Sequence, residues 1–185
     1  MVRRMLLRDL SLDGKLILRG KDRVRFLNGM LTNDIAKLAP GAGCRAAMLT
    51  VKGRLVGDLL VFADEAALLV DLAPDLTTKI HDNLERHLIV DEVEIEDASG
   101  RLDEIGLYGD DARAAIERVL GPLPELPPWG HVVVKWREAE VRVVRAVELG
   151  LAGYRLIGSA LAVAAELGEV ERLDEARVEI LRVEA

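Results

Sequence analysis

The sequence predicts an α+β fold with mainly antiparallel sheets and packed helices. Strand-like runs occur as hairpin pairs between helical segments, without the strict alternation of strand and helix that builds a parallel sheet. The chain has 185 residues, of which 50% are hydrophobic, so it can bury a sizeable core. This length fits a single globular unit or two small intertwined subdomains.

The first part of the chain predicts a strand followed by a helix. A strand-like run covers Lys15 to Arg19 and stops at Gly20. Asp22 can then cap a helix that ends near Asn33, because a short acidic side chain accepts hydrogen bonds from the first free amides of a helix. Three apolar residues recur in this segment at helical spacing: Val24, Leu27 and Leu31.

A β-hairpin is expected next. Its first strand covers 45–51, its turn is Lys52-Gly53, and its second strand continues to Phe62. A cluster of turn-forming residues at 39–43 separates this hairpin from the preceding helix.

The middle of the chain predicts a strand at 66–72, an amphipathic helix at 75–88 and a strand at 93–97. The segment 101–108 is expected to pair antiparallel with 93–97 across the turn Ser99-Gly100. A helix at 110–120 follows.

The segment 121–130 contains four prolines and is the best candidate for a break between subdomains, although a loop inside one domain explains it equally well. The remaining predicted elements are strands at 131–136, 141–147 and 154–157, and helices at 159–167 and 173–183.

Composition excludes several classes of function. The formal net charge is -7 and the chain has no block of Lys and Arg, so a nucleic-acid surface is not expected. There is no run of about 18 apolar residues and no apolar signal segment, so we expect no membrane span and a cytoplasmic location. Cys44 is the only cysteine, and His81 and His87 would lie on different sides of a helix, so no metal site is expected.

Asp58 is the most informative single residue, because a carboxylate is unusual in the middle of an otherwise apolar strand. Alternation along the strand places Asp58 on one face with Val56, Leu60 and Phe62. An ionised carboxylate among apolar neighbours costs several kcal/mol unless it is paired or its pKa rises, and both outcomes suit a functional site. An edge strand whose polar face meets water explains the residue equally well.

Two other residue types allow more than one interpretation. Cys44 lies beside Arg45, so its thiol pKa could be lowered, but a small half-buried side chain is the favoured interpretation. Trp129 and Trp136 flank a strand and are expected to fill a core instead of binding a ligand.

Several short segments, taken in order, resemble the folate-binding family of glycine-cleavage T-proteins (aminomethyltransferases) and the YgfZ-type iron-sulfur assembly proteins. They are Gly20-Lys21-Asp22-Arg23, Phe26-Leu27-Asn28-Gly29, Leu31-Thr32-Asn33-Asp34-Ile35, Lys52-Gly53-Arg54 and Asp58. The terminal segment Leu181 to Ala185 is similar to an Arg-x-Glu-Ala segment of the same family, so the resemblance spans residues 1–185.

The resemblance implies a tetrahydrofolate site between two interleaved α+β subdomains. Asp58 matches the family aspartate that lies near the folate nitrogens and is the expected catalytic residue. Asn33 and Asp34 match a segment lining the approach to that site, although both could simply end a helix. The implied folate contacts also include the turn residues Lys52, Gly53 and Arg54, whose sequence is nearer the YgfZ type.

Two departures from the family pattern bear on function. A family glutamate in a Thr-Gly-Glu-x-Gly run aligns with Leu151, ahead of Gly153 and Tyr154, which weakens the case for aminomethyl transfer. The C-terminal β-barrel domain of the family is absent from these 185 residues, together with its Lys-Gly-Cys-Tyr signature.

The leading hypothesis is a YgfZ-like tetrahydrofolate-binding protein that supports iron-sulfur cluster assembly or repair. The alternatives are an aminomethyltransferase that transfers a one-carbon unit to tetrahydrofolate, and a non-catalytic interaction module. A protein partner or self-association through the C-terminal helix is expected, because Ile180 and Val183 would lack cover there.

Overall fold

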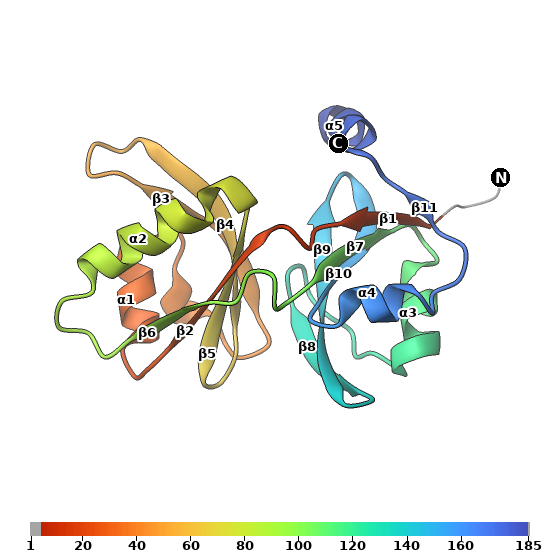
Figure 1. Ribbon diagram of the computed structural model, residues 1–185, viewed down its shortest axis with the longest axis horizontal. Coiled ribbons are helices and arrows are strands. Elements are labelled where there is room, and N and C mark those ends of the chain that lie inside the picture. The colour runs from red at the N-terminus through yellow and green to blue at the C-terminus, as the bar shows by residue number, and fades with distance from the viewer. Residues whose placement is uncertain (1–4, 185) are drawn as a thin grey trace. The chain divides into compact units, whose positions relative to one another are not determined.

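A computed structural model describes residues 5–184 and divides the chain into two compact units (Figure 1). The second unit, Leu12–Gly100, is inserted between the two segments of the first, Met1–Ser11 and Arg101–Ala185. The α+β prediction is confirmed. Ala185, the last residue of the terminal family segment, lies outside the described residues.

The second unit is a five-stranded antiparallel sheet of order β3-β4-β5-β2-β6. Its elements are β2 (Gly14–Arg19), α1 (Arg23–Met30), η1 (Ile35–Lys37), β3 (Gly43–Leu49), β4 (Leu55–Ala63), β5 (Ala67–Leu72), η2 (Pro74–Leu76), α2 (Thr77–His87) and β6 (Glu94–Asp97).

Helices α1 and α2 pack on one face of this sheet because each has a buried apolar stripe. Phe26 and Leu27 of α1, and Ile80 and Leu84 of α2, join the core formed by alternate residues of the strands. Burying each such side chain contributes roughly 1.5–3 kcal/mol to stability. Gly57 lies under this contact, where a Cβ atom would be 2.5 Å from Leu76 Cδ1.

The first unit is a six-stranded mixed sheet of order β11-β1-β7-β10-β9-β8, in which only the pairing of β1 with β11 is parallel. Its elements are β1 (Leu6–Asp9), β7 (Glu104–Tyr108), α3 (Ala112–Leu120), β8 (His131–Trp136), β9 (Ala139–Glu148), β10 (Leu151–Ile157), α4 (Ala160–Ala164), β11 (Glu171–Arg172) and α5 (Glu175–Glu184).

Helices α3 and α4 share a core with Leu107 of β7, whereas Val178 of α5 packs with Tyr108. Because successive strand residues point to opposite faces, α5 covers the face of the sheet opposite α3 and α4. Trp129 and Trp136 are half-buried against these cores, as predicted.

One prediction of connectivity is corrected. Strand β7 pairs with β1 and β10, not with β6, because the chain passes from one unit to the other at Gly100. The proline-rich segment 121–130 lies inside the first unit, where Trp129 N donates to Arg145 O of β9 at 3.0 Å, which agrees with the second of the two interpretations that the sequence left open.

The start of α1 also differs in detail from the prediction. Asp22 precedes the helix, but its Oδ2 accepts a hydrogen bond from Glu92 N at 2.9 Å and does not cap α1. The helix ends at Met30, three residues before the predicted end near Asn33, where the chain turns to pair with β3. Within residues 5–184, no helix is both long and apolar enough to cross a membrane.

Candidate functional site

Asp58 lies in the middle of β4, between β3 and β5, so the strand that carries it is not an edge strand. It pairs with Ala47. As predicted, it shares its face with Leu60 and Phe62. Val56 does not share that face, because Leu55 pairs with Leu49 and Gly57 with Met48, leaving Val56 as the extra residue of a β-bulge. The bulge turns Val56 into the helix-covered core.

The Asp58 side chain is 72% exposed, whereas Leu60 and Phe62 on the same face are buried. The expectation of a sheltered carboxylate is therefore wrong for the described chain. Asp58 contacts water, as expected for a polar strand face, whereas Leu60 and Phe62 are buried, as expected for an interior strand.

Arg45 is the partner of Asp58 that the sequence analysis did not place in the site. The register that pairs Ala47 with Asp58 puts Arg45 opposite Leu60, on the same face as Asp58. Arg45 Nη2 lies 3.9 Å from Asp58 Oδ2, and the Arg45 side chain is 60% exposed. The signal was present in the sequence, because a hairpin turn near Lys52-Gly53 fixes which residues of the two strands face each other.

Cys44 points away from this pair, since adjacent strand residues alternate between faces. Its side chain is half-buried and packs against the helix-covered core, as the favoured interpretation predicted. Burial raises the pKa of the Cys44 thiol, so the idea of a thiolate stabilised by Arg45 is wrong.

The loop that follows α1 is attached to the outer edge of β3 beside the Arg45–Asp58 pair. Thr32 N donates to Ala47 O, and Ala47 N donates to Thr32 Oγ1, both at 2.9 Å. Asn33 Nδ2 donates to Arg45 O at 2.8 Å. The structure therefore ties Asn33 to the backbone of Arg45, whose side chain faces Asp58.

The polar ends of Asn33 and Asp34 are engaged within the chain. Asn33 Oδ1 accepts a hydrogen bond from Asp34 N at 2.8 Å. The Asp34 carboxylate lies 2.8 Å from Lys37 Nζ, and this hydrogen bond and ion pair raise the pKa of Lys37. These contacts fit a positioning role for both residues.

Lys52, Gly53 and Arg54 form the exposed turn of the β3–β4 hairpin. Gly53 has a φ of 74°, a conformation that glycine adopts without strain, and its N–H donates to Thr50 O at 2.8 Å. At roughly 3.3 Å per residue, Arg54 lies about 13 Å along β4 from Asp58. The structure therefore does not bring this turn together with Asp58 and Asn33.

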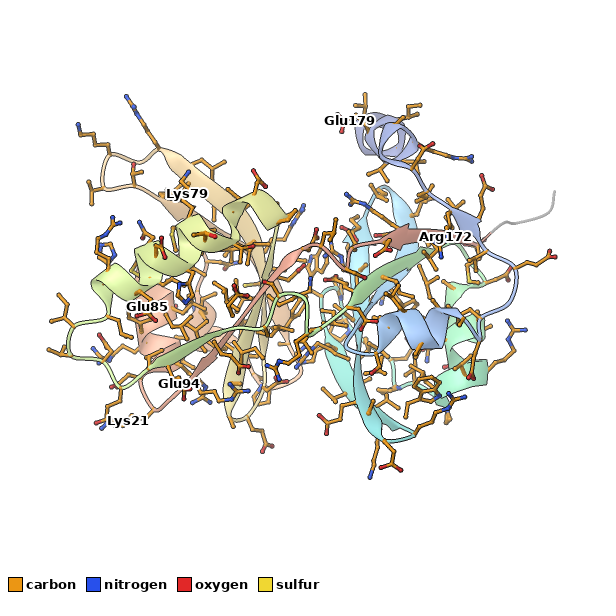
Figure 2. All side chains as sticks on the ribbon, in the orientation of Figure 1. Lys21, Lys79, Glu85, Glu94, Arg172 and Glu179 are labelled. Carbon is orange, nitrogen blue, oxygen red and sulfur yellow. The ribbon has the colours of Figure 1, made fainter. Side chains whose placement is uncertain are left out.

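Helix α2 contacts strand β4 of the hairpin at the β-bulge. Lys79 Nζ, on the helix surface, donates to Val56 O at the bulge at 3.4 Å (Figure 2). This contact comes from the helix-covered side of the sheet, so it supports β4 from the face opposite Asp58.

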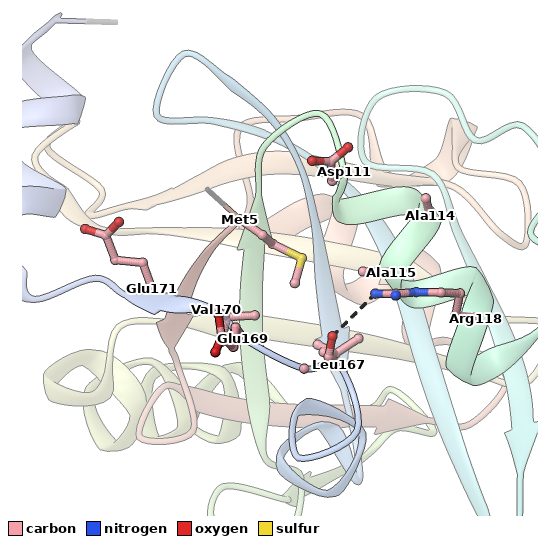
Figure 3. A pocket seen from close by; sticks show the side chains of 10 residues that line it. Met5, Asp111, Ala114, Ala115, Arg118, Leu167, Glu169, Val170 and Glu171 are labelled. Carbon is pink, nitrogen blue, oxygen red and sulfur yellow. Dashed lines mark hydrogen bonds between the residues drawn. The ribbon is translucent and has the colours of Figure 1, made fainter. Parts of the chain in front are cut away.

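A cavity of about 1020 Å³ lies in the first unit, between α3 and the loop 167–171 (Figure 3). Met5, Leu167 and Val170 give it an apolar lining, and Arg118 Nη2 approaches Leu167 O at 3.5 Å. The sequence-predicted site residues are not among its lining residues.

A buried polar cluster in the first unit was also missed by sequence analysis. Arg155 donates to both carboxylate oxygens of Glu148 at 2.8 Å and to Glu104 Oε1 at 3.0 Å. Tyr108 Oη donates to Glu148 Oε1 at 2.6 Å. Burial raises the pKa of Glu148, but the hydrogen bonds and charge of Arg155, with the Tyr108 hydroxyl, outweigh it and hold that pKa below its ordinary value of 4.5.

Comparisons with known proteins agree on one family. The family model described as the GCVT N-terminal domain matches residues 1–162. The aminomethyltransferase of Chloroherpeton thalassium is 35% identical over 113 residues, which are 60% of this chain and 31% of that protein. The aminomethyltransferase of Synechocystis sp. is 25% identical over 158 residues, 82% of this chain and 42% of that protein.

Solved structures show the same fold. The glycine cleavage system aminomethyltransferase T from Bartonella henselae superposes with a TM-score of 0.88 at 22% identity, covering 98% of this chain and 51% of that chain. A chain of the heterotetrameric sarcosine oxidase from Corynebacterium sp. U-96 superposes with a TM-score of 0.61 at 16% identity, covering 97% and 84%. The chain thus spans less than half of each curated relative named here.

Proposed function

The chain belongs to the GCVT N-terminal domain family, and on this premise we propose that it binds tetrahydrofolate as the folate-binding region of an aminomethyltransferase. The observation that carries the proposal is the arrangement of Asp58 on β4, Arg45 on the neighbouring edge strand β3, and the Thr32–Asp34 loop bonded to the backbone of β3. These residues include the ones on which the sequence resemblance depends.

Asp58 is the catalytic residue in this proposal. A carboxylate beside the folate nitrogens accepts a hydrogen bond from an amine and stabilises the positive charge that develops as a one-carbon unit is transferred. Asn33 holds the edge strand in place, Asp34 contacts the folate from the same loop, and Lys52, Gly53 and Arg54 contact a distal part of the folate. Leu151, the first residue of β10, is the position that the resemblance aligns with a family glutamate, so the proposal assigns the catalytic role to Asp58 alone.

This proposal reverses the order of the two sequence hypotheses. The Lys52-Gly53-Arg54 turn favoured a YgfZ-like role in iron-sulfur cluster assembly, but the curated relatives named above are aminomethyltransferases. Transfer to tetrahydrofolate therefore becomes the leading function, and folate binding without turnover becomes the alternative.

Calorimetric titration with tetrahydrofolate tests the binding step. We expect the wild-type chain to bind, and Asp58→Asn to weaken binding by about tenfold or more through loss of a charge-assisted hydrogen bond. Asp82→Asn is the matched control, because Asp82 on α2 is also largely exposed. A folded wild-type sample that releases no heat at high micromolar tetrahydrofolate would reject the proposal.

Turnover separates the two family readings. With an aminomethyl-lipoyl carrier and tetrahydrofolate, an aminomethyltransferase releases ammonia, and we expect Asp58→Asn to abolish that release. Tetrahydrofolate binding with no ammonia from the wild-type protein would favour the binding-only reading instead.

We also propose that α5 contacts a protein partner or a second copy of the chain. Ile180 and Val183 on this helix are 57% and 78% exposed. Sedimentation velocity over a range of protein concentrations should show association that Val183→Glu weakens. A concentration-independent monomer would leave only a heterologous partner for this helix.

A further inference from the structure

The loop between α1 and β3 carries Asn33 and Asp34, and it is attached to the protein at both ends. At its first end, Thr32 N donates to Ala47 O of the edge strand β3, and Thr32 Oγ1 accepts from Ala47 N, both at 2.9 Å. Asn33 and Asp34 are exposed. Surface loops are more mobile than the elements they connect, so the second attachment decides how Asp34 is presented.

The second end is held by Asn28, a half-buried residue of α1. Asn28 Oδ1 accepts a hydrogen bond from Ala36 N at 3.0 Å, eight residues further along the chain. Ala36 lies in the short helix η1, and the first amides of a helix have no acceptor within the helix itself. In the described chain, the side chain of Asp34, which precedes η1, makes no capping hydrogen bond. Asn28 therefore caps η1 from a neighbouring helix.

The position of η1 determines where the Asp34 carboxylate lies. Ile35, the first residue of η1, is fully buried in the helix-covered core. Lys37, the last residue of η1, has its Nζ 2.8 Å from Asp34 Oδ2. Because Asn28 and Ile35 fix η1 at two points, they also set the direction of the Asp34 side chain.

Asparagine at position 28 has a cost within its own helix. Asparagine is a weaker helix former than alanine, because its side chain competes for backbone hydrogen bonds. The oxygen of Asn28 is instead used outside α1, on η1. Alanine at this position would favour α1 and remove the cap of η1, so its two effects on global stability oppose each other. Its effect on the loop has no such compensation.

We propose that Asn28 is a positioning residue for the folate site, which holds Asp34 in place by capping η1. This role rests on the proposed function, in which Asp34 contacts the folate. Asn28 acts through the loop and does not touch the ligand. A group that is held in place before binding loses less conformational freedom on binding, so loss of the cap should lower the affinity.

Calorimetric titration with tetrahydrofolate tests this role in the wild-type chain and two variants. We expect Asn28→Ala to weaken binding by about tenfold, since ordering the loop then opposes binding. Asn28→Asp should bind within about threefold of wild type, because a carboxylate oxygen in the same place also accepts from Ala36 N. Unchanged binding by Asn28→Ala, or an equal loss in both variants, would overturn the proposal.

Asp103→Ala is the matched control. Asp103 caps the short helix α4 of the first unit in the same way, accepting from Ala160 N at 3.0 Å and from Leu161 N at 2.8 Å. Its loss removes a helix cap without acting on η1, so the tetrahydrofolate affinity should stay within about twofold of wild type. Equal weakening by Asp103→Ala and Asn28→Ala would mean that affinity follows general stability, and it would overturn the role of Asn28.

Amide hydrogen exchange measures the state of the loop without ligand. Asn28→Ala should speed exchange of the Ala36 amide by about tenfold or more, whereas Asn28→Asp should not, because that amide keeps its acceptor. Unchanged exchange in Asn28→Ala would show that the cap does not hold η1, and it would also overturn the proposal.

Failure of this inference is distinguishable from failure of the folate proposal. If the wild-type chain does not bind tetrahydrofolate, the folate proposal and the role of Asn28 are rejected together. Wild-type binding that Asn28→Ala leaves unchanged rejects the role of Asn28 alone.

Discussion

At the residue scale, Tyr108 organises one face of the first unit. Its side chain is fully buried and its ring lies over Gly106 of its own strand and Gly153 of β10. A Cβ atom on Gly153 would be 2.5 Å from the ring and 2.9 Å from Leu107 O. Close packing against a rigid ring and a backbone carbonyl explains why glycine occupies this position.

We predict that Gly153→Ala destabilises the protein by about 1–3 kcal/mol, because neither neighbour can move aside without strain. Gly29→Ala is the matched control and should have the opposite effect on stability, since Gly29 lies in helix α1 and an added Cβ there meets nothing within 4 Å. It should stabilise the protein by about 0.5–1 kcal/mol. Urea unfolding of both variants measures these changes, and equal effects of the same sign would contradict the packing explanation.

Stability should fall at alkaline pH because of Tyr108. Burial, and then the nearby charge of Glu148, raise the pKa of Tyr108 well above its ordinary value of 10.0. A group whose pKa is raised by folding contributes stability that is complete below the unfolded pKa and is lost as pH rises through the folded pKa. Urea unfolding at a series of pH values above 10.0 should show this loss, and Tyr108→Phe should reduce the slope.

At the element scale, the short helix α4 depends on a residue far away in the sequence. Ser159, which precedes it, has a φ of 45°, and in the described chain its side chain makes no capping hydrogen bond. The helix start is capped by Asp103, whose carboxylate accepts from Ala160 N at 3.0 Å and from Leu161 N at 2.8 Å. The Asp103 side chain, next to the start of β7, therefore fixes the start of α4.

Asp103→Ala should destabilise the protein by about 1–2 kcal/mol, because it leaves two helix amides without their acceptor. Ser159→Ala should change stability by less than about 0.5 kcal/mol, as for most substitutions that break no specific contact. Thermal unfolding followed by circular dichroism compares the two. A larger effect at Ser159 than at Asp103 would show that the cap has been misassigned.

The elements that could be predicted from sequence were those with a local signal. Strand β4 and helix α2 have clear periodicity in their apolar residues. The turn at Gly53 then predicts that β3 pairs with β4. Strands β1 and β11 were missed because they span four and two residues and exist through pairing with partners distant in sequence. Strand β7 was given the wrong partner for the same reason.

In the candidate site, too, features with a local sequence signal could be predicted and features that depend on distant residues could not. Alternation placed Asp58 on the correct face with Leu60, but the β-bulge at Val56 has no signature in the sequence. The exposure of Asp58 depends on what lies over the face of the sheet, which strand periodicity does not report. The position of Arg45 on the Asp58 face could have been predicted from the hairpin register, because the turn at Gly53 fixes which residues of the two strands face each other.

At the scale of the whole molecule, the sequence of the second unit is inserted into that of the first, and both tryptophans belong to the first unit. Trp129 and Trp136 lie in the segment Arg101–Ala185. Their fluorescence therefore reports on the first unit, including the effect of its N-terminal strand β1.

Leu7→Ala should lower the stability reported by tryptophan fluorescence by about 2–5 kcal/mol, because Leu7 is buried in the core shared with α3 and α4. Leu12→Ala is the control, since Leu12 is 85% exposed only a few residues away. Urea unfolding monitored at the tryptophan emission maximum gives both values. An unchanged transition in Leu7→Ala would mean that β1 contributes little to its sheet.

The pairing of β1 with a strand that is distant in sequence determines the order in which the chain can fold as it leaves the ribosome. Leu6–Asp9 is translated first, yet its partner β7 begins at Glu104, on the order of ten seconds later at about 5–20 residues per second. The nested unit Leu12–Gly100 is complete before that strand arrives. Leu6 and Leu7 therefore lack this strand partner while the whole second unit is synthesised, and in that interval they can be bound by chaperones that recognise apolar segments.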